Sequence, residues 1–282
     1  MNVQNVKGVC LEAGGVRVVA YLPVLRMLKT KAWPTKFAGT SGGAVVSFLL
    51  AIGYTPDEIW SLMNNGLMKR MSPRSNYLMA SYRKGLRKSE AIISVLEDVC
   101  MAKTGMLNPT FGDIKERFNT DLYVYAVNET LGVGEIFCAE EDESESAILA
   151  VAASAAIQIY YTPVKIGPFL YSDGGALNPY PIKYLSDPSY GNLQPDEILG
   201  LMIERSSELT GEPFVADSLS SRFGRILDIM VQGNSKVHMS DELYARTLKI
   251  SDMGVSSTDF NMSVKNSMKL EMAGYAKSKE LR

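Results

Sequence analysis

The stretch Gly39-Thr40-Ser41-Gly42-Gly43 has the form G-x-S-x-G, and the rest of the chain is best understood from it. It follows the extended apolar residues 36–38 and precedes a helix-like run over 44–52. A strand, a sharp turn and a helix are what a nucleophile elbow requires, because the glycines let two backbones pass closely while the middle residue is held strained. Ser41 is therefore the candidate nucleophile.

Glycine turns divide the N-terminal part of the chain into two strand-and-helix units. Residues 6–11 form a short apolar run that ends at Gly14-Gly15, and residues 16–28 carry apolar side chains at helical spacing. Residues 36–52 repeat this order. The repetition predicts an α/β fold with a mainly parallel sheet.

Further elements follow from caps, alternation and helical spacing. From about residue 217 to the end the pattern is helical. The other predicted elements are a capped helix over 55–64, a helix over 89–101, a cap at 110–113, a hairpin or an edge pair of 122–127 and 133–138, a buried helix over 147–161, short strands at 163–166 and 169–171, and a strand over 197–203.

Composition excludes several classes of function. With 46% hydrophobic and 21% charged residues and a net charge of −2, the chain is typical of a globular enzyme and lacks the positive field of a nucleic-acid binder. Its three cysteines contain no CxxC pair, so neither a disulfide scaffold nor a zinc site is expected. No secretory signal or membrane span is evident, which predicts a protein that is cytoplasmic at synthesis, while specialised secretion stays open.

An activated serine needs a base, and two residues are candidates. Asp173 is delivered by a predicted strand into the turn Ser172-Asp173-Gly174-Gly175, although Asp-Gly is also an ordinary turn dipeptide. His238 is the one histidine of the sequence, and the order Ser41, Asp173, His238 matches that of α/β-hydrolase triads. A carboxylate within hydrogen-bond reach can replace the imidazole, so a Ser41-Asp173 dyad and a triad both stay open.

Four blocks in this order resemble one family, the patatin-like phospholipases, which are serine acyl hydrolases with a Ser-Asp dyad. The glycine-rich block is Leu11-Glu12-Ala13-Gly14-Gly15-Val16-Arg17-Val18, and the nucleophile block is Gly39-Thr40-Ser41-Gly42-Gly43-Ala44. An Ala/Ser-rich block, Ala152-Ala153-Ser154-Ala155-Ala156-Ile157, precedes Asp173-Gly174-Gly175-Ala176-Leu177-Asn178-Pro179. The similarity covers roughly residues 6–205.

The resemblance implies a three-layer α/β/α fold and calcium-independent hydrolysis of acyl esters of phospholipids or other membrane lipids, with no metal and no cofactor. It implies a catalytic core over 1–205, a lid or membrane-docking region within 68–105, and an additional helical C-terminal region over 206–282 packed on the core. The implied site residues are Ser41 as nucleophile, Asp173 as base, Gly14, Gly15 and Val16 in the oxyanion hole, and Arg17, Gly39, Gly43 and Gly174 as supporting residues.

Three positions depart from the family pattern. Ala13 replaces a common glycine, Val18 stands where a glycine often follows the basic residue, and Gln158 stands where proline is usual. Ala13 lacks the freedom of glycine to adopt positive φ, so the loop is expected to follow a slightly different path. Two alternatives stay open: a catalytically silent or partner-activated lipid-binding protein, and a transacylase that uses the same acyl-enzyme.

The most uneven charge distribution lies between residues 69 and 88, where basic residues alternate with Met, Leu and Tyr and no acidic residue occurs. Each basic residue near an anionic membrane contributes about 1 kcal/mol, so the stretch suits peripheral membrane contact. A solvated helix face paired with acidic neighbours is the alternative. A protein activator or an oligomer is neither indicated nor excluded. The membrane-docking candidates are Arg83, Lys84, Arg87 and Lys88.

Overall fold

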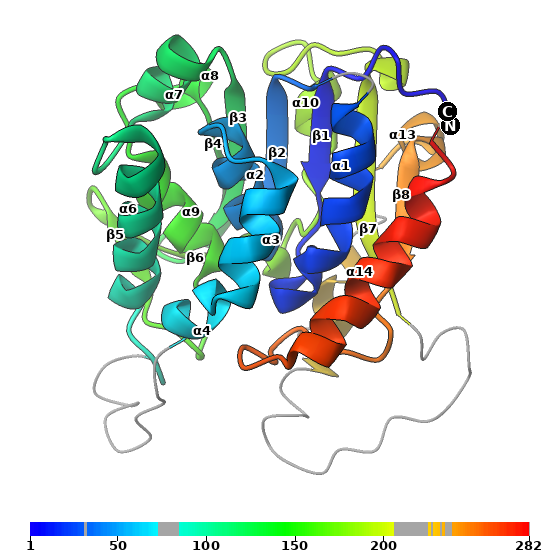
Figure 1. Cartoon of the computed structure of the whole chain (residues 1–282). Helices are drawn as coiled ribbons and strands as arrows, with labels where there is room; N and C mark the ends of the chain where they lie inside the picture. The colour runs from blue at the N-terminus through cyan, green and yellow to red at the C-terminus, as the bar shows by residue number, and fades with distance from the viewer. Residues whose placement is uncertain are drawn as a thin grey trace.

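The structure, a computed structural model, describes residues 1–30, 33–72, 85–205, 225–226, 228–231, 233–234 and 239–281. These residues form one eight-stranded sheet in the order β5-β6-β3-β2-β1-β7-β8, with β4 paired to β3 outside this path (Figure 1). The strands are β1 (Gly8–Leu11), β2 (Lys36–Thr40), β3 (Asp121–Asn128), β4 (Val133–Phe137), β5 (Val164–Ile166), β6 (Phe169–Asp173), β7 (Ile198–Glu204) and β8 (Thr247–Ser251).

The centre of the sheet is parallel and one side of it is antiparallel. Strands β3, β2, β1, β7 and β8 run parallel to one another, whereas β4 and β6 pair antiparallel with β3 and β5 pairs antiparallel with β6. The α/β class and the β3–β4 hairpin predicted from the sequence are therefore confirmed.

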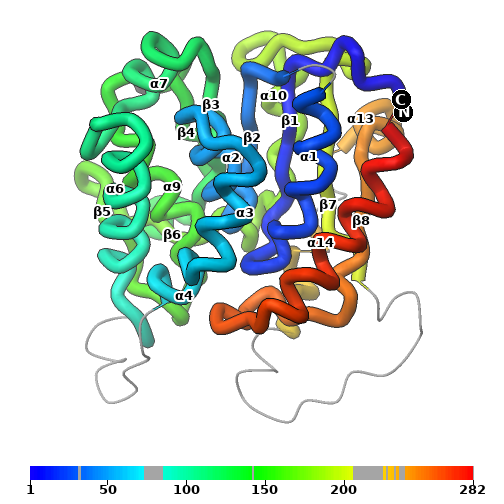
Figure 2. The backbone as a smooth tube through the Cα atoms, viewed as in Figure 1, coloured from blue at the N-terminus to red at the C-terminus, as the bar shows by residue number. Residues whose placement is uncertain are grey.

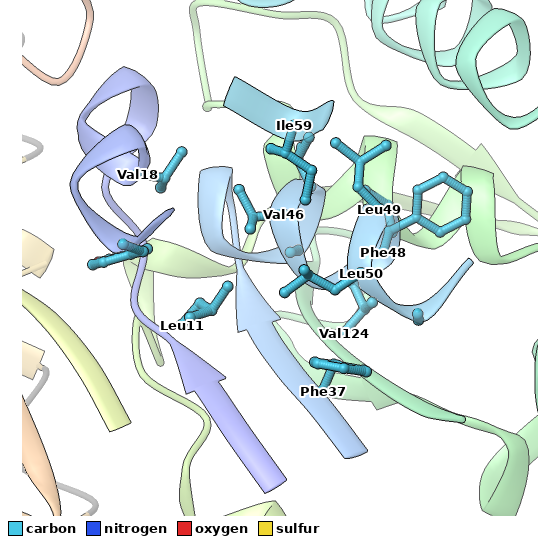
Figure 3. Close-up of a cluster of buried hydrophobic side chains, with 14 of the residues drawn as sticks. Leu11, Val18, Phe37, Val46, Phe48, Leu49, Leu50, Ile59 and Val124 are labelled. Carbon is cyan, nitrogen blue, oxygen red and sulfur yellow. The ribbon is translucent and has the colours of Figure 1, made fainter. Parts of the chain in front are cut away.

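Side chains of the central strands alternate between two apolar clusters, as the period of a strand requires. Leu11, Phe37 and Val124 join the larger cluster, which Figure 3 shows between the strands and the residues of α2. Cys10 and Tyr123, one position earlier in the same strands, join the smaller cluster on the other face. Both faces of the sheet are therefore covered, and the molecule has three layers.

Helices of unequal number cover the two faces. The smaller cluster lies under α10 (Lys183–Ser186) and α13 (Asp241–Ala245). The larger cluster lies under η1 (Gly15–Tyr21), α1 (Leu22–Lys29), α2 (Gly42–Ala51), α3 (Pro56–Asn64), α4 (Leu67–Met71), α6 (Glu90–Thr104), α7 (Phe111–Phe118), α9 (Ala147–Ala155) and α14 (Val264–Ser278). The other helices of the described residues are α8 (Ala139–Asp142), η3 (Gly174–Ala176) and η4 (Pro195–Glu197).

Two of the sequence predictions need correction. The C-terminal region is not helical throughout, because Thr247–Ser251 forms β8, which extends the sheet beside β7. Figure 2 shows that β8 and α14 lie beside β7 and α1, so this region is built into the same three layers. The helix predicted over 147–161 ends at Ala155, since the chain turns there towards β5. No helix among the described residues is long and apolar enough to cross a membrane.

Candidate active site

The strand register brings the ends of β2 and β6 together. Thr40 pairs with Tyr125 of β3, and Asp173 pairs with Ala126, the next residue of the same strand. Since β4 occupies the opposite edge of β3, β2 and β6 follow one another along a single edge. Ser41, directly after β2, therefore meets Asp173, and its Oγ donates a hydrogen bond to Asp173 Oδ2 at 2.6 Å.

The backbone at Ser41 has the geometry of a tight elbow. Its φ of 57° and ψ of −127° are unusual for a residue with a side chain, and such strain is found at functional sites. The turn leaves no room beside it: a Cβ on Gly39 would lie 2.5 Å from the carbonyl carbon of Gly43, and one on Gly43 would lie 2.3 Å from the carbonyl oxygen of Leu11. Both glycines are thus required by close backbone approach.

Ser154 holds the elbow from α9. The backbone N–H of Ser41 donates to Ser154 Oγ at 2.9 Å, and Ser154 Oγ donates to the carbonyl oxygen of Tyr125 at 2.7 Å. This chain of bonds ties the strained residue to β3. Ser154 is not among the site residues predicted from the sequence, although it is a single polar residue in an otherwise apolar helix, which is a recognisable signal.

The carboxyl group of Asp173 is buried and held in one orientation. Its Oδ1 accepts the backbone N–H of Gly175 at 2.7 Å, while Oδ2 faces Ser41. Burial raises the pKa of Asp173 to about 6, against the lowering effect of these two hydrogen bonds. Gln158 supports the same strand end, because its Nε2 donates to the carbonyl oxygen of Asp173 at 2.8 Å. A glutamine thus makes a specific contact where proline is usual in the family.

The glycine-rich loop lies against the elbow. A Cβ on Gly42 would lie 3.1 Å from the backbone nitrogen of Gly15, so these two residues are neighbours. Within the described residues, neither of their N–H groups donates a hydrogen bond. Val16, predicted as an oxyanion donor, instead donates its N–H to Ser257 O at 3.0 Å. Gly42 is a candidate donor that the sequence analysis did not name.

Ala13 fits the loop without positive φ, and its N–H donates to Pro179 O at 2.9 Å. Glycine is indispensable two residues later, where Gly15 has a φ of 55° and a Cβ would lie 2.1 Å from Ser257 O. The replacement of the family's first glycine by alanine is therefore compatible with the shape of the loop.

Two small cavities meet at Ser41. One, of about 40 Å³, is lined by Ser41, Asp173, Arg17 and the glycine loop. The other, of about 30 Å³, is mainly apolar and shares Ser41, Gly15 and Ile157 with the first. Its remaining lining residues are Gly42, Val45, Met68, Met71, Ile92, Ala155, Tyr161 and Phe260.

The other residues predicted from the sequence either lie away from Ser41 and Asp173 or fall outside the residues that the structure describes. Arg83, Lys84 and His238 are outside the described residues. Arg87 does not face solvent freely, because its guanidinium stacks over the Tyr160 ring at 3.9 Å from the ring centroid. Lys88 is exposed. Among the residues that the structure describes, no cluster of acidic, His or Cys side chains could hold a metal ion.

Comparison with known proteins agrees with the fold and the motifs. A sequence model of the family named Patatin-like phospholipase matches residues 9–186, which is more than half of the chain. The chain therefore belongs to the patatin-like phospholipase family, as the resemblance predicted.

Its relatives include viral and bacterial proteins. The chain is 33% identical to the probable lipid hydrolase 463L of Invertebrate iridescent virus 6 over 179 residues, which are 62% of each chain. It is 22% identical to YqhO of Bacillus subtilis (strain 168), with 92% of each chain covered.

Solved structures share the fold at low identity. VipD from Legionella pneumophila superposes with a TM-score of 0.59 at 16% identity, covering 98% of this chain and 66% of VipD. ExoU from Pseudomonas aeruginosa, solved in complex with SpcU, gives a TM-score of 0.52 at 14% identity, covering 99% of this chain and 52% of that one. The chain thus spans less than two thirds of the length of 463L, VipD and ExoU.

Proposed function

We propose that the chain is a lipid acyl hydrolase that cleaves acyl esters of membrane phospholipids through an acyl-enzyme on Ser41, with Asp173 as the base. The observation that carries this proposal is the 2.6 Å hydrogen bond from Ser41 Oγ to a buried carboxylate, made at a strained elbow. Family membership and the similarity to a probable lipid hydrolase support the lipid class of substrate.

The proposed reaction has two halves. Ser41 Oγ attacks the acyl carbonyl carbon while Asp173 accepts the hydroxyl proton, and that proton passes to the departing alcohol as the carbonyl–oxygen bond breaks. Water then attacks the acyl-enzyme, Asp173 accepts its proton, and the fatty acid leaves as Ser41 is regenerated. A pKa of about 6 suits both transfers, since Asp173 is mainly ionised at neutral pH yet gives its proton back readily.

The proposed oxyanion hole consists of the N–H groups of Gly15 and Gly42. They are neighbours beside Ser41, and one such donor contributes about 3 kcal/mol to the transition state. Gly14, which was also predicted as an oxyanion donor, lines the cavity of about 40 Å³ together with Gly15 and Ser41. The N–H of Val16 is used by Ser257, so Val16 is left out of the proposed oxyanion hole.

The mainly apolar cavity on the other side of Ser41 is the proposed place for the start of the acyl chain. The reaction needs no metal or cofactor, and it places the protein at a membrane surface as a peripheral protein.

The test is hydrolysis of mixed phospholipid vesicles in EDTA, with fatty acid and lysophospholipid measured by mass spectrometry. We expect the wild-type chain to release both products without calcium and Ser41→Ala to release neither. Ser47→Ala is the matched control, because Ser47 is also a buried serine near the elbow but donates only to Ala38 O. Equal release by wild type and Ser41→Ala would overturn the proposal, and acyl transfer to added alcohol would identify a transacylase.

A further inference from the structure

Asp228 places one carboxylate oxygen among three donors beside the catalytic cavity. Its Oδ1 lies 2.8 Å from Arg17 Nη2, 3.1 Å from Ser257 Oγ and 3.7 Å from Arg205 Nη2. The side chains of Arg17 and Arg205 are only 4% and 7% exposed. Two buried guanidinium groups and a hydroxyl around one oxygen are the kind of arrangement that binds phosphate oxygens.

Arg17 has further contacts that keep it in place. Its Nε donates to Gly14 O at 3.3 Å, and its Nη1 lies 3.5 Å from Asp252 Oδ2. These contacts come from the glycine loop and from the chain after β8. Arg17 would therefore keep its position, and one ionic partner, if the carboxylate of Asp228 moved away.

Asp228 belongs to residues 225–226, 228–231 and 233–234, which we call the cover segment. Asn234 of this segment donates its side-chain N–H to Ala176 O at 2.8 Å. Asp228, Met230 and Val231 line the cavity together with Ser41 and Asp173. On the outside, Ile226 and Ile229 are 48% and 54% exposed. Three residues of the cover segment thus form part of the wall of the catalytic cavity.

The cavity is small beside the sites that usually bind small molecules. Its volume is about 40 Å³, whereas sites that bind small molecules commonly measure about 300–1,000 Å³. A lipid phosphate can contact Arg17, Ser257 and Arg205 at the position of Asp228 Oδ1 only when that carboxylate has left it. When the carboxylate of Asp228 leaves, the two guanidinium groups lose one negative charge that they share, and another anion can restore it.

We propose that Arg17, Arg205 and Ser257 form the subsite for the phosphate of the substrate lipid, and that Asp228 is its internal occupant, exchanged for that phosphate when substrate binds. The inference rests on the proposed function and adds the residues that hold the phosphate of the substrate. A phosphodiester carries one negative charge, like the carboxylate that it replaces, so the exchange leaves the ionic balance of the subsite unchanged.

The experiment compares two dispersed substrates with the same short acyl chains, a diacyl phosphatidylglycerol and a diacylglycerol, below their aggregation limits. Asp228→Asn removes the competing charge but keeps an oxygen for Ser257 and Arg17. We expect the ratio of kcat/KM for the phospholipid to kcat/KM for the diacylglycerol to rise about tenfold or more, as for one charge-assisted hydrogen bond. An equal rise of kcat/KM for both substrates would show that Asp228 only holds the cover segment in place. It would contradict the proposed phosphate subsite.

Inorganic phosphate separates a headgroup site from a general anion site. As an inhibitor of diacylglycerol hydrolysis it should bind at least about tenfold more tightly to Asp228→Asn than to wild type. Tighter inhibition without faster phospholipid hydrolysis would assign the site to free phosphate and would contradict the headgroup assignment. Asp228→Glu, which keeps the carboxylate, should behave as wild type in both assays.

Two further variants keep the inference testable if Asp228→Asn does not fold, which thermal unfolding will show. Arg17→Lys should lower kcat/KM for the phospholipid by about tenfold and affect diacylglycerol less, because lysine cannot bind two oxygens side by side. Asn234→Ala loosens the same segment without changing charge, so it should affect both substrates alike. If wild type hydrolyses neither substrate, the proposed function fails; if it hydrolyses both and no variant changes their ratio, only the phosphate subsite fails.

Discussion

Asp173→Asn is expected to lower kcat/KM for ester hydrolysis by about 10³- to 10⁴-fold while leaving the protein folded. An asparagine side chain can fill the same space and accept the N–H of Gly175, but it cannot take the proton of Ser41. The measurement is the initial rate with a dispersed short-chain ester. Asp241→Asn changes an exposed carboxylate on α13 and should retain full activity. Loss of less than tenfold in Asp173→Asn would show that another group is the base.

The same residue predicts the dependence of activity and stability on pH. Activity of the wild type should rise with pH through about 6, because Asp173 must be ionised to accept a proton. Its pKa is raised from 3.8 on folding, so the folded state binds more protons than the unfolded state between about pH 4 and 6. The contribution of Asp173 to stability therefore decreases as pH rises through this window, by at most about 3 kcal/mol.

Asp173→Asn should remove that decrease. Denaturant unfolding at pH 4 and at pH 7 gives the difference in the free energy of unfolding between wild type and variant at each pH. We expect the variant to gain stability relative to wild type at pH 7 and to show little such gain at pH 4. If the difference in the free energy of unfolding were the same at both pH values, the raised pKa of the buried Asp173 carboxyl group would be contradicted.

Gly43→Ala is expected to destabilise the fold by about 3 kcal/mol and to abolish activity, because its Cβ would lie 2.3 Å from Leu11 O and 2.7 Å from Glu12 O. These are backbone atoms of β1 and the glycine loop, which cannot move aside as a flexible side chain can. The control is Gly132→Ala in the β3–β4 turn, where a Cβ meets nothing within 4 Å and only the φ of 71° opposes it. That change should cost about 1 kcal/mol and spare activity.

The free energy of unfolding in urea compares the two glycine variants. Similar losses for Gly43→Ala and Gly132→Ala would mean that the elbow tolerates a side chain at its crossing point. The close backbone contact between Gly43 of α2 and the residues Leu11 and Glu12 would then not be what requires a glycine.

Much of the fold follows from local patterns in the sequence. The helix caps at Thr55 and Thr110 are present as predicted, because a cap depends on residues only three positions apart. The elbow at residues 39–43 and the glycine-rich loop at residues 11–18 can likewise be recognised as motifs in the sequence. By contrast, the alternation of Leu248 and Ile250 with polar neighbours in β8 covers only five residues, which is too short to identify a strand by itself within a polar stretch. Pairing with β7 and burial of these two side chains under α14 stabilise it as a strand.

The site could be predicted from sequence only where motifs carry it. Ser41 and Asp173 stand in recognisable blocks, and the register of β3 then brings them together. Asp228 has no motif: its partner Arg17 is 211 residues away, and the contact depends on how the C-terminal region packs. Ser257 O, which holds the N–H of Val16, is a backbone group and leaves no trace in the residue type at all.

The central claim is that Ser41 is an activated nucleophile, and labelling by a fluorophosphonate tests it most directly. Intact-protein mass spectrometry followed by peptide mapping should find one adduct on wild type, located on Ser41, and none on Ser41→Ala. The labelling rate should increase with pH through about 6, as Asp173 ionises. Absence of labelling in the folded wild type, or an unchanged adduct in Ser41→Ala, would contradict the account.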